Sequence, residues 1–301
     1  MTKIPSLHDA LARERPLQVV GVVNAYCALL ARRAGFRSLY LSGAGVANAD
    51  LGVPDLAITT LHDVASQTDR ITSAVDLPLL VDADTGFGSA FNIARTVRTL
   101  ERAGAAGLHL EDQVAAKRCG HRPGKRLVPA SEMVDRLKAA LDARENRAFV
   151  IMARTDAAAV EGLETAIDRA HLYVEAGADM IFAEALTDEA SYARFTNAVS
   201  VPVLANMTEF GRTPLLDLAT LGRLGVALAL YPLTAFRAMS AAAQHTYEVL
   251  RRDGHQRALL KAMQTREELY EILNYHAYEH RLDRLFGAGD DGGRPNEETI
   301  S

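Results

Sequence analysis

Cysteine and tryptophan are nearly or wholly missing from this chain of 301 residues, which holds two cysteines and no tryptophan. One pair of cysteines, Cys27 and Cys119, cannot build a disulfide framework, so we expect a reducing compartment, the cytoplasm. No apolar run reaches the roughly 20 residues that a membrane span requires. The stretch from Met1 to Pro16 is polar and charged, without the apolar core of a signal peptide.

A large excess of either charge is also absent. The net charge is -5, with 24% charged and 49% hydrophobic residues. This balance gives no reason to expect nucleic acid or an anionic membrane as a partner. The hydrophobic content is ample for a large core. No linker or shift in composition divides the chain, so we expect one domain from residue 1 to 286.

Short apolar runs alternate with longer amphipathic segments from about residue 17 onward. The predicted strands are Val19–Val23, Ser38–Leu41, Leu79–Val81, Gly107–Leu110, Phe149–Ala153, Met180–Phe182, Val203–Ala205 and Ala227–Leu230. The predicted helices between them are Ala25–Ala34, Leu61–Ala74, Ala90–Ala103, Ser131–Ala143, Leu163–Ala176, Glu189–Val199 and Thr213–Leu224. This eightfold alternation predicts a parallel (β/α)8 TIM barrel. An open doubly wound sheet is the alternative, but no Gly-x-Gly-x-x-Gly follows the first strand.

Glycine follows several of these helices, at Gly35, Gly104, Gly177 and Gly225. It suits the position after a helix, where the backbone turns left-handed. Beyond the eighth strand, Phe236–Arg251 and Gln256–Phe286 have helical periodicity, which predicts a helical extension packed on another subunit or over the barrel. The polar residues 287–301 predict a disordered tail.

Polar residues stand just after nearly every predicted strand, which is where the active sites of such barrels lie. They are Ser42, Asp82, Asp84, Glu111, Arg154, Glu184, Asn206, Thr208, Glu209 and, beyond the eighth strand, Arg237. Random surface polarity would not favour one end of the barrel so consistently. This arrangement indicates an active site rather than a solvated rim.

Asp82 and Asp84 are two residues apart, so in an extended segment both side chains point to the same side. With Glu111 from the next strand they suit Mg²⁺, which needs only one or two carboxylates. The alternative is that the two aspartates cap the next helix or pair with an arginine. Arg154 and Arg237 offer forks for substrate carboxylates, with structural ion pairs as the alternative. His109 on its strand is more often a satisfied core histidine than a catalyst.

The segment from Lys117 to Lys125 places Cys119 among four cations and a histidine, with glycines and a proline that disfavour regular structure. Such surroundings stabilise a thiolate, although an exposed basic loop with an incidental cysteine is equally compatible. Together these groups favour metal-assisted cleavage of a carbon–carbon bond in a polycarboxylate. Cys119 would move a proton once the loop closes over the substrate.

Several motifs closely resemble the isocitrate lyase and phosphoenolpyruvate mutase superfamily, in its lyase branch. They are Lys117-Arg118-Cys119-Gly120-His121, Tyr40-Leu41-Ser42-Gly43, Leu51 to Asp55, Val81 to Gly88, Leu110 to Gln113, Met152 to Asp156, Ala205 to Gly211, Ala229 to Pro232 and Met263 to Tyr270. The likeness covers nearly the whole chain. It is greatest to the short bacterial members, which lack the insertions of isocitrate lyase proper.

This resemblance implies cleavage of 2-methylisocitrate to pyruvate and succinate in the methylcitrate route, by a homotetramer that swaps its last barrel helix between subunits. It implies that Asp82 and Asp84 hold Mg²⁺, with Mn²⁺ as an alternative ion, and that Asp55 and Glu111 lie in the outer shell. The residues that it implies for substrate contact are Ser42, Gly43, Ala44, Cys119, Gly120, Arg154, Glu184, Asn206, Thr208, Glu209, Arg237 and Arg266.

Cys119 would be the acid that protonates the succinate carbanion, with its pKa lowered by Lys117 and His121. The base stays open between Tyr40 and the acids around the metal, Glu111 among them. Ala44 departs from the family, which commonly has glycine there. One alternative is isocitrate lyase, which shares the cysteine. An oxaloacetate decarboxylase or a phosphonopyruvate enzyme is a second alternative, and either would lack the cysteine. A third is a non-catalytic metabolite-binding barrel, for which we would expect some of the polar residues at the strand ends to be lost.

Overall fold

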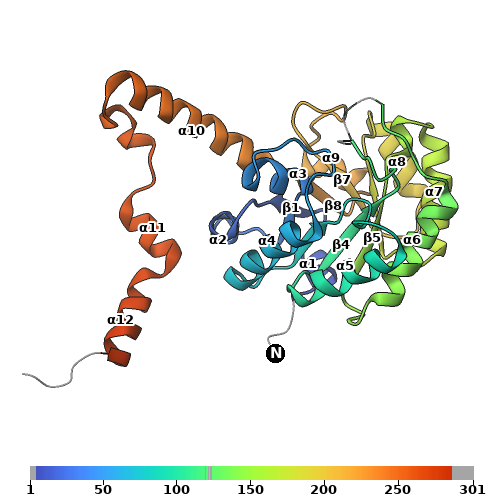
Figure 1. Ribbon diagram of the computed structural model, residues 1–301. Coiled ribbons are helices and arrows are strands. Elements are labelled where there is room, and N and C mark those ends of the chain that lie inside the picture. Colours follow the sequence, from blue (N-terminus) through green and yellow to red (C-terminus); the bar gives the residue numbers. More distant parts are fainter. Residues whose placement is uncertain (1–4, 119, 121, 123, 287–301) are drawn as a thin grey trace, which may run out of the picture. The chain divides into compact units, whose positions relative to one another are not determined.

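Eight parallel strands form a closed barrel in the computed structural model, which describes residues 5–118, 120, 122 and 124–286 (Figure 1). Each strand pairs with the next along the chain, and β8 pairs with β1. The strands are β1 (Leu17–Gly21), β2 (Ser38–Leu41), β3 (Leu79–Asp82), β4 (Gly107–Glu111), β5 (Val150–Thr155), β6 (Met180–Ala183), β7 (Val203–Asn206) and β8 (Leu228–Tyr231). The predicted (β/α)8 barrel is confirmed.

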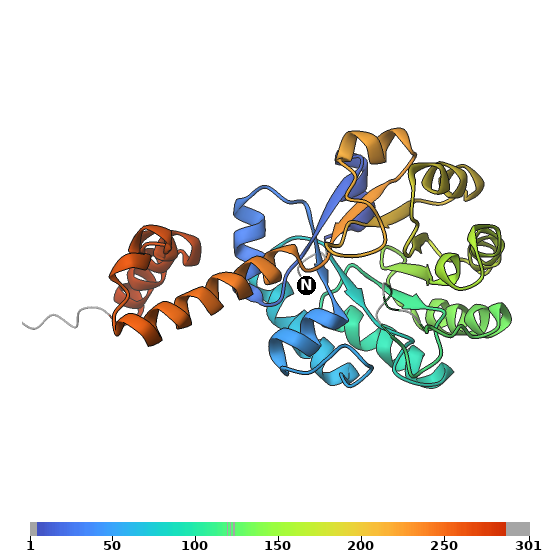
Figure 2. The same ribbon diagram turned by 90° about the horizontal axis from the view of Figure 1, so that it is seen from above.

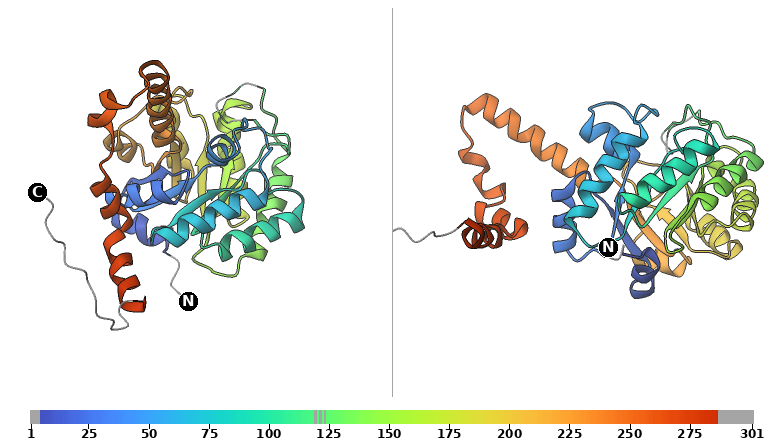
Figure 3. Two further views of the ribbon diagram at one scale, coloured as in Figure 1. Left: turned by 60° about the vertical axis from the view of Figure 1, so that its left-hand side comes forward. Right: turned by 60° about the horizontal axis from the view of Figure 1, so that its bottom comes forward.

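Helices surround this ring of strands, as the view from above shows (Figure 2). They are α2 (Ala25–Arg33), α4 (Leu61–Ala74), α5 (Ala90–Arg102), α6 (Ala130–Ala143), α7 (Leu163–Glu175), α8 (Glu189–Ala198) and α9 (Leu218–Arg223). Three further helices are α1 (Leu7–Arg13), α3 (Gly43–Gly45) and α10 (Thr234–Asp253), which follows β8. Short irregular helices are η1 (Val46–Asp50) and η2 (Ala157–Ala159). Neighbouring outer helices such as α4 and α5 lie side by side and contact each other (Figure 3).

The core has two layers, because strand residues alternate between the inside of the barrel and the helices outside it. Inside lie residues such as Leu80, Met152, Phe182 and Leu204, together with Leu7 and other apolar residues of α1. The larger outer layer joins the opposite strand faces to the helices. Helix α1 therefore supplies apolar side chains to the barrel interior, a role that the polar composition of its segment did not predict.

Left-handed glycines end four of the outer helices, as the sequence predicts. The φ angles of Gly35, Gly104, Gly177 and Gly225 lie between +79° and +106°. Only glycine adopts this backbone region without strain. Each strand that follows therefore starts at a defined point relative to its helix.

Two predicted helices are wrong in extent. The helix predicted over Thr213–Leu224 is only the six residues of α9, because Pro214 precedes it and the Asp217 side chain caps its first turn. The helix predicted over Gln256–Phe286 is broken into η3 (Arg257–Ala262), α11 (Arg266–Leu273) and α12 (Tyr275–Phe286). A capping box at Thr265 starts α11, and the left-handed Asn274 ends it.

The chain divides into two compact units, residues 1–245 and 246–301. The first is the barrel with most of α10. The second contains α11 and α12, where Tyr270 stacks on Tyr275 with 4.3 Å between ring centroids. Within the described residues, no helix combines the length and the apolar character that a membrane crossing requires.

Candidate active site

The same inward faces that are apolar in the middle of the barrel become polar two residues further along. Leu80 is followed by Asp82, Met152 by Arg154, Phe182 by Glu184 and Leu204 by Asn206. These polar side chains meet at the carboxyl end of the strands, around a cavity of about 80 Å³. The cavity is lined by Tyr40, Ser42, Ala44, Asp55, Asp82, Glu111, Lys117, Arg118, Gly120, Arg154, Phe182, Glu184, Asn206, Thr208, Leu230, Pro232, Leu233 and Arg237.

A wider hollow of about 340 Å³ is lined by Asp84 together with residues such as Thr59, Phe87 and Arg95. It contains none of the charged side chains that line the smaller cavity. The chemistry therefore belongs to the smaller cavity, and most of the predicted site residues do lie around it.

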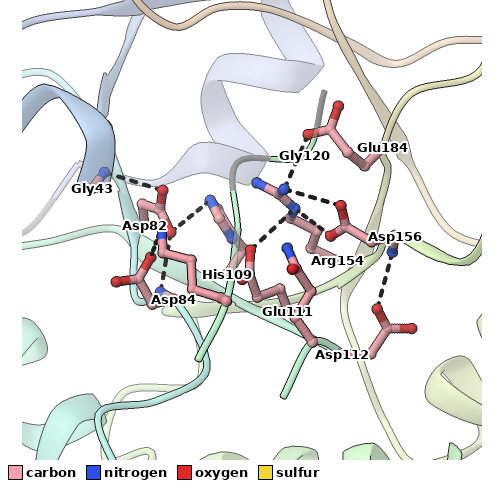
Figure 4. Close-up of polar contacts among 12 residues, drawn as sticks. Gly43, Asp82, Asp84, His109, Glu111, Asp112, Gly120, Arg154, Asp156 and Glu184 are labelled. Atoms are coloured by element: carbon pink, nitrogen blue, oxygen red, sulfur yellow. Dashed lines mark hydrogen bonds and ion pairs between the residues drawn. The ribbon is translucent and has the colours of Figure 1, made fainter. Parts of the chain in front are cut away.

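Asp82 ends β3 and is held by backbone groups on both sides (Figure 4). Its Oδ2 accepts a hydrogen bond from the Gly43 N–H at 3.0 Å, and its Oδ1 accepts one from the Asp84 N–H at 3.0 Å. Burial alone would raise the pKa of Asp82, but His109, Lys117 and Arg154 hold it well below its usual range. Asp82 is therefore a fixed anion.

Tyr40 and His109 are buried next to Asp82 and are linked to it by hydrogen bonds. The Tyr40 hydroxyl lies 2.8 Å from His109 Nε2 and 3.4 Å from Asp82 Oδ2. Burial lowers the pKa of His109 to about 4, and His109 Nδ1 has no partner among the described residues. We assign the proton to Nε2, because an unpaired acceptor costs less than an unpaired donor. His109 then donates to Tyr40, and Tyr40 donates to Asp82.

Asp84 and Asp55 share one cation, Lys117. Its ammonium lies 2.7 Å from Asp84 Oδ1 and 2.5 Å from Asp55 Oδ1. Burial and the charge of Asp82 raise the pKa of Asp84 to about 6. Asp84 also has a φ of +48°, an uncommon backbone angle for a residue other than glycine. The carboxylates of Asp84 and Asp82 both border Gly43, where an added β-carbon would lie 3.2 Å from Asp84 Oδ1 and from Asp82 Oδ2.

These two aspartates fit Mg²⁺ by the chemistry of their oxygens. Asp84 Oδ1 is buried and receives no well-aligned hydrogen bond among the described residues, although a cation, Lys117, lies beside it. No cluster of three or more metal-binding side chains occurs in the described part of the chain. Mg²⁺ does not require one, since it keeps several waters and takes one or two carboxylates.

Arg154, at the end of β5, is the centre of the opposite side of the cavity (Figure 4). Its guanidinium forks onto Asp156 at 2.9 and 3.3 Å, and it lies 3.3 Å from Glu184 and 3.4 Å from Glu111. Phe182 lies beneath it, 5.0 Å from ring centroid to Cζ. Arg154 is thus buried, charged and held in one orientation.

Glu111 differs from the other acids around Arg154. Burial raises its pKa well above the usual range despite the nearby guanidinium, and its Oε1 has no partner among the described residues. Glu184 instead receives hydrogen bonds from the Asn206 side chain at 3.3 and 3.4 Å. Glu111 is therefore the group here best suited to carry a proton.

Arg237 and Glu209 lie at the rim, 3.6 Å apart, and the Thr234 hydroxyl donates to Glu209. Arg237 also lies over Phe210. Cys119 and His121 lie outside the described residues, and Arg266 belongs to the second unit, so their predicted roles stay predictions. Ala44, the position where the resemblance led us to expect glycine, lines the cavity.

Two residues of this site were missed as functional by sequence reasoning, Asp156 and Lys125. Asp156 holds both Arg154 and Lys125. Its position two residues beyond Arg154, after the same strand, was an available signal. Lys125 is the last residue of the basic segment that contains Cys119. Its partner Asp156 is 31 residues away along the chain, so no local sequence pattern predicts their contact.

Comparison with known proteins places these observations among known enzymes. The family model for phosphoenolpyruvate phosphomutase matches residues 7–251. A 2-methylisocitrate lyase of Escherichia coli (strain K12) is 61% identical over 92% of this chain and 94% of its own. That of Salmonella typhimurium is 60% identical over the same shares of the two chains.

Solved structures agree with these sequence relatives. A 2,3-dimethylmalate lyase, a member of the PEP mutase/isocitrate lyase superfamily, has a TM-score of 0.87 and 34% identity, over 96% of this chain and 97% of its own. A phosphonopyruvate hydrolase in complex with oxalate and Mg²⁺ has a TM-score of 0.82 and 29% identity, over 93% and 98%.

Proposed function

The chain belongs to the phosphoenolpyruvate phosphomutase family, and from this premise we propose that it is a carbon–carbon lyase that cleaves 2-methylisocitrate to pyruvate and succinate. The observation that carries the proposal is the 61% identity to a lyase of this name along nearly the full length of both chains. This reaction would serve the methylcitrate route of propionate catabolism.

Mg²⁺ is the metal that we propose for Asp82 and Asp84, with Mn²⁺ as an alternative and Asp55 and Glu111 in the outer shell. When bound, the ion would supply a Lewis acid for the negative charge that develops on the substrate's oxygens. The oxalate and Mg²⁺ in the related hydrolase support this role. The excess of carboxylates over cations beside Lys117 supports it independently.

Arg154 would bind a substrate carboxylate through the guanidinium N–H groups that do not point at Asp156, with Glu184 and Asn206 beside it. Ser42, Gly43, Ala44, Gly120, Thr208, Glu209, Arg237 and Arg266 are the further contacts proposed for the substrate. Gly43 already donates its N–H to Asp82, so its first role is to hold that carboxylate.

The reaction requires one base and one acid. A base removes the hydroxyl proton, the carbon–carbon bond breaks as the carbonyl of pyruvate forms, and the electron pair passes to the succinate carbon, which Cys119 protonates. Burial raises the pKa of Tyr40 well above its usual range. A raised pKa disfavours the tyrosinate form that a base requires. The carboxylates of the metal site are the other candidates for the base, beside Tyr40.

The tetramer, the exchange of a helix between subunits and the cytoplasmic location are parts of this proposal as well. So are the single domain over residues 1–286 and the tail beyond it. Gel filtration with light scattering tests the tetramer, since a monomer or a dimer would contradict it.

A coupled assay tests the reaction itself. Pyruvate release from 2-methylisocitrate is measured beside glyoxylate release from isocitrate, each with Mg²⁺ and with EDTA. We expect Mg²⁺-dependent pyruvate release that far exceeds glyoxylate release. A preference for isocitrate would make the chain a short isocitrate lyase, and silence on both substrates would contradict either lyase and direct attention to oxaloacetate, phosphonopyruvate and Ala44.

A further inference from the structure

Lys125 makes two close contacts that tie separate parts of the site together. Its ammonium donates to the Gly120 carbonyl at 2.5 Å and lies 2.7 Å from Asp156 Oδ1. The Lys125 side chain is 3% exposed and that of Asp156 is fully buried. A lysine rarely buries its charge unless the charge is paired. This one is paired with an acid of the active site.

Asp156 is shared between two cations. One of its oxygens accepts from Lys125 and from Arg154 Nη2, while the other accepts from Arg154 Nε. Its backbone N–H donates to Asp112 at 2.9 Å, which fixes the start of η2 behind it. The orientation of Arg154 therefore depends on a carboxylate whose own position Lys125 helps to set.

Gly120 lies directly against the arginine and its other acid (Figure 4). A β-carbon at this position would lie 2.5 Å from Arg154 Nη2 and 2.7 Å from Glu184 Cδ, so no side chain fits. The Gly120 backbone is thus part of the cavity wall, and its carbonyl is the group that Lys125 holds.

We propose that Lys125 is a positioning residue for the lyase reaction, one that fixes the Gly120 carbonyl and, through Asp156, the fork of Arg154. This inference rests on the proposed function only in the choice of the reaction to be assayed. The positioning of Gly120 and Asp156 is inferred from the contacts of Lys125 alone. Lys125 does not line the cavity, so it acts through these two neighbours and not on the substrate.

A purely structural ion pair is the competing explanation. Replacement of one partner in a buried pair destabilises a protein whatever the pair does for activity. The two explanations differ in kinetics, because a group that orients Arg154 and Gly120 changes turnover in enzyme that is fully folded.

The test compares Lys125→Met, which keeps the aliphatic stem, with Lys125→Arg, which keeps a donor and a charge. Lys138→Met is the matched control. Lys138 is exposed, and its ion pair with the exposed Asp135 is a long contact of 3.9 Å. Steady-state rates are measured with saturating Mg²⁺ below the unfolding temperature of each variant. We expect Lys125→Met to lower kcat roughly a hundredfold, with a smaller change in KM, because misplacement by about 1 Å has that cost.

Lys125→Arg should recover part of this loss, and Lys138→Met should match the parent. Hydrogen exchange of the peptide that contains Gly120 should be faster in Lys125→Met alone. Kinetic constants within twofold of the parent would overturn the proposal, even if the melting temperature fell. If Lys125→Met does not fold, Lys125→Leu, which also lacks both the charge and the donor, takes its place, and parent-like kinetics there would overturn the proposal equally.

Hydrogen exchange also separates this inference from the proposed function. A parent protein that is silent on 2-methylisocitrate would contradict the proposed reaction. Unchanged exchange at the Gly120 peptide in Lys125→Met would instead contradict the contact between Lys125 and Gly120, whatever the substrate is.

Discussion

The two sides of the cavity carry the same kinds of charged group in different proportions, with three acids to one cation on the first side and three acids to two cations on the second. On the first side, the carboxylate half, Asp55, Asp82 and Asp84 surround the single ammonium of Lys117. Negative charge is in excess there even in a low-dielectric site, where unbalanced charge is costly. Such a site attracts a divalent cation, which restores the balance.

The second side, the arginine half, has two cations, Arg154 and Lys125, among Glu111, Asp156 and Glu184. Burial also raises the pKa of Glu111, which favours its protonated form and lowers the negative charge on this side. A substrate carboxylate would therefore meet less excess negative charge here than beside Lys117. The comparison indicates that the balance of fixed charges separates the half proposed for the metal from the half proposed for the organic acid.

Asp84→Ala would break the carboxylate half and should have the largest effect. It removes one of the two proposed metal ligands and one of the two partners of Lys117. We expect activity to fall by about 10³-fold or more, since a charge-stabilising group in the active site is lost. Isothermal titration should show weakened Mg²⁺ binding.

Asp135→Ala, a change to an exposed carboxylate, is the control for this variant and should leave both quantities unchanged. Full activity of the parent protein in EDTA would contradict the assignment of a metal to the carboxylate half.

Arg154→Lys would sharpen the comparison from the other side. Lysine keeps the charge but cannot fork onto Asp156 while it reaches Glu184. We expect kcat/KM to fall by roughly a hundredfold, the loss that follows when a buried charge pair or a bidentate contact is broken. Mg²⁺ affinity, measured by titration, should stay within about threefold of the parent, because the proposed metal ligands belong to the other half.

The control is Arg194→Lys, which alters an exposed pair with Glu164 and should change nothing measurable. If Mg²⁺ affinity fell as far as kcat/KM in Arg154→Lys, the two halves would not be separate.

Much of this arrangement could be predicted from the sequence, because it follows from local periodicity. Strand and helix patterns define the barrel, and polar residues at strand ends predict Asp82, Arg154, Glu184 and Asn206. The pairing of Lys117 with Asp55 could not, since 62 residues separate them and only the closed barrel brings them together. The same holds for Lys125 with Asp156, and for the break at Asn274, which depends on one left-handed residue.

Replacement of His109, which lies next to Asp82 of the carboxylate half, should have the smallest of the predicted effects, and that effect is on the pH dependence of stability. Burial lowers its pKa to about 4, whereas an unfolded histidine has a pKa near 6.5. The unfolded chain therefore binds a proton more readily, so the metal-free protein loses stability as the pH falls from about 6.5 toward 4. From pH 8 to pH 5 this group alone should cost about 2 kcal/mol.

Asp84 acts in the opposite direction, because its pKa is raised to about 6 and its ionised form is the one that folding disfavours. Burial also raises the pKa values of Glu111 and Asp112, so the total pH dependence of the parent mixes several groups. The informative quantity is therefore the difference between the parent and His109→Gln. Urea unfolding at pH 8 and pH 5 in EDTA should give a parent that loses more stability on acidification than the variant does. Equal losses would mean that His109 is not held neutral, and the hydrogen-bond chain from His109 through Tyr40 to Asp82 would then run in another direction.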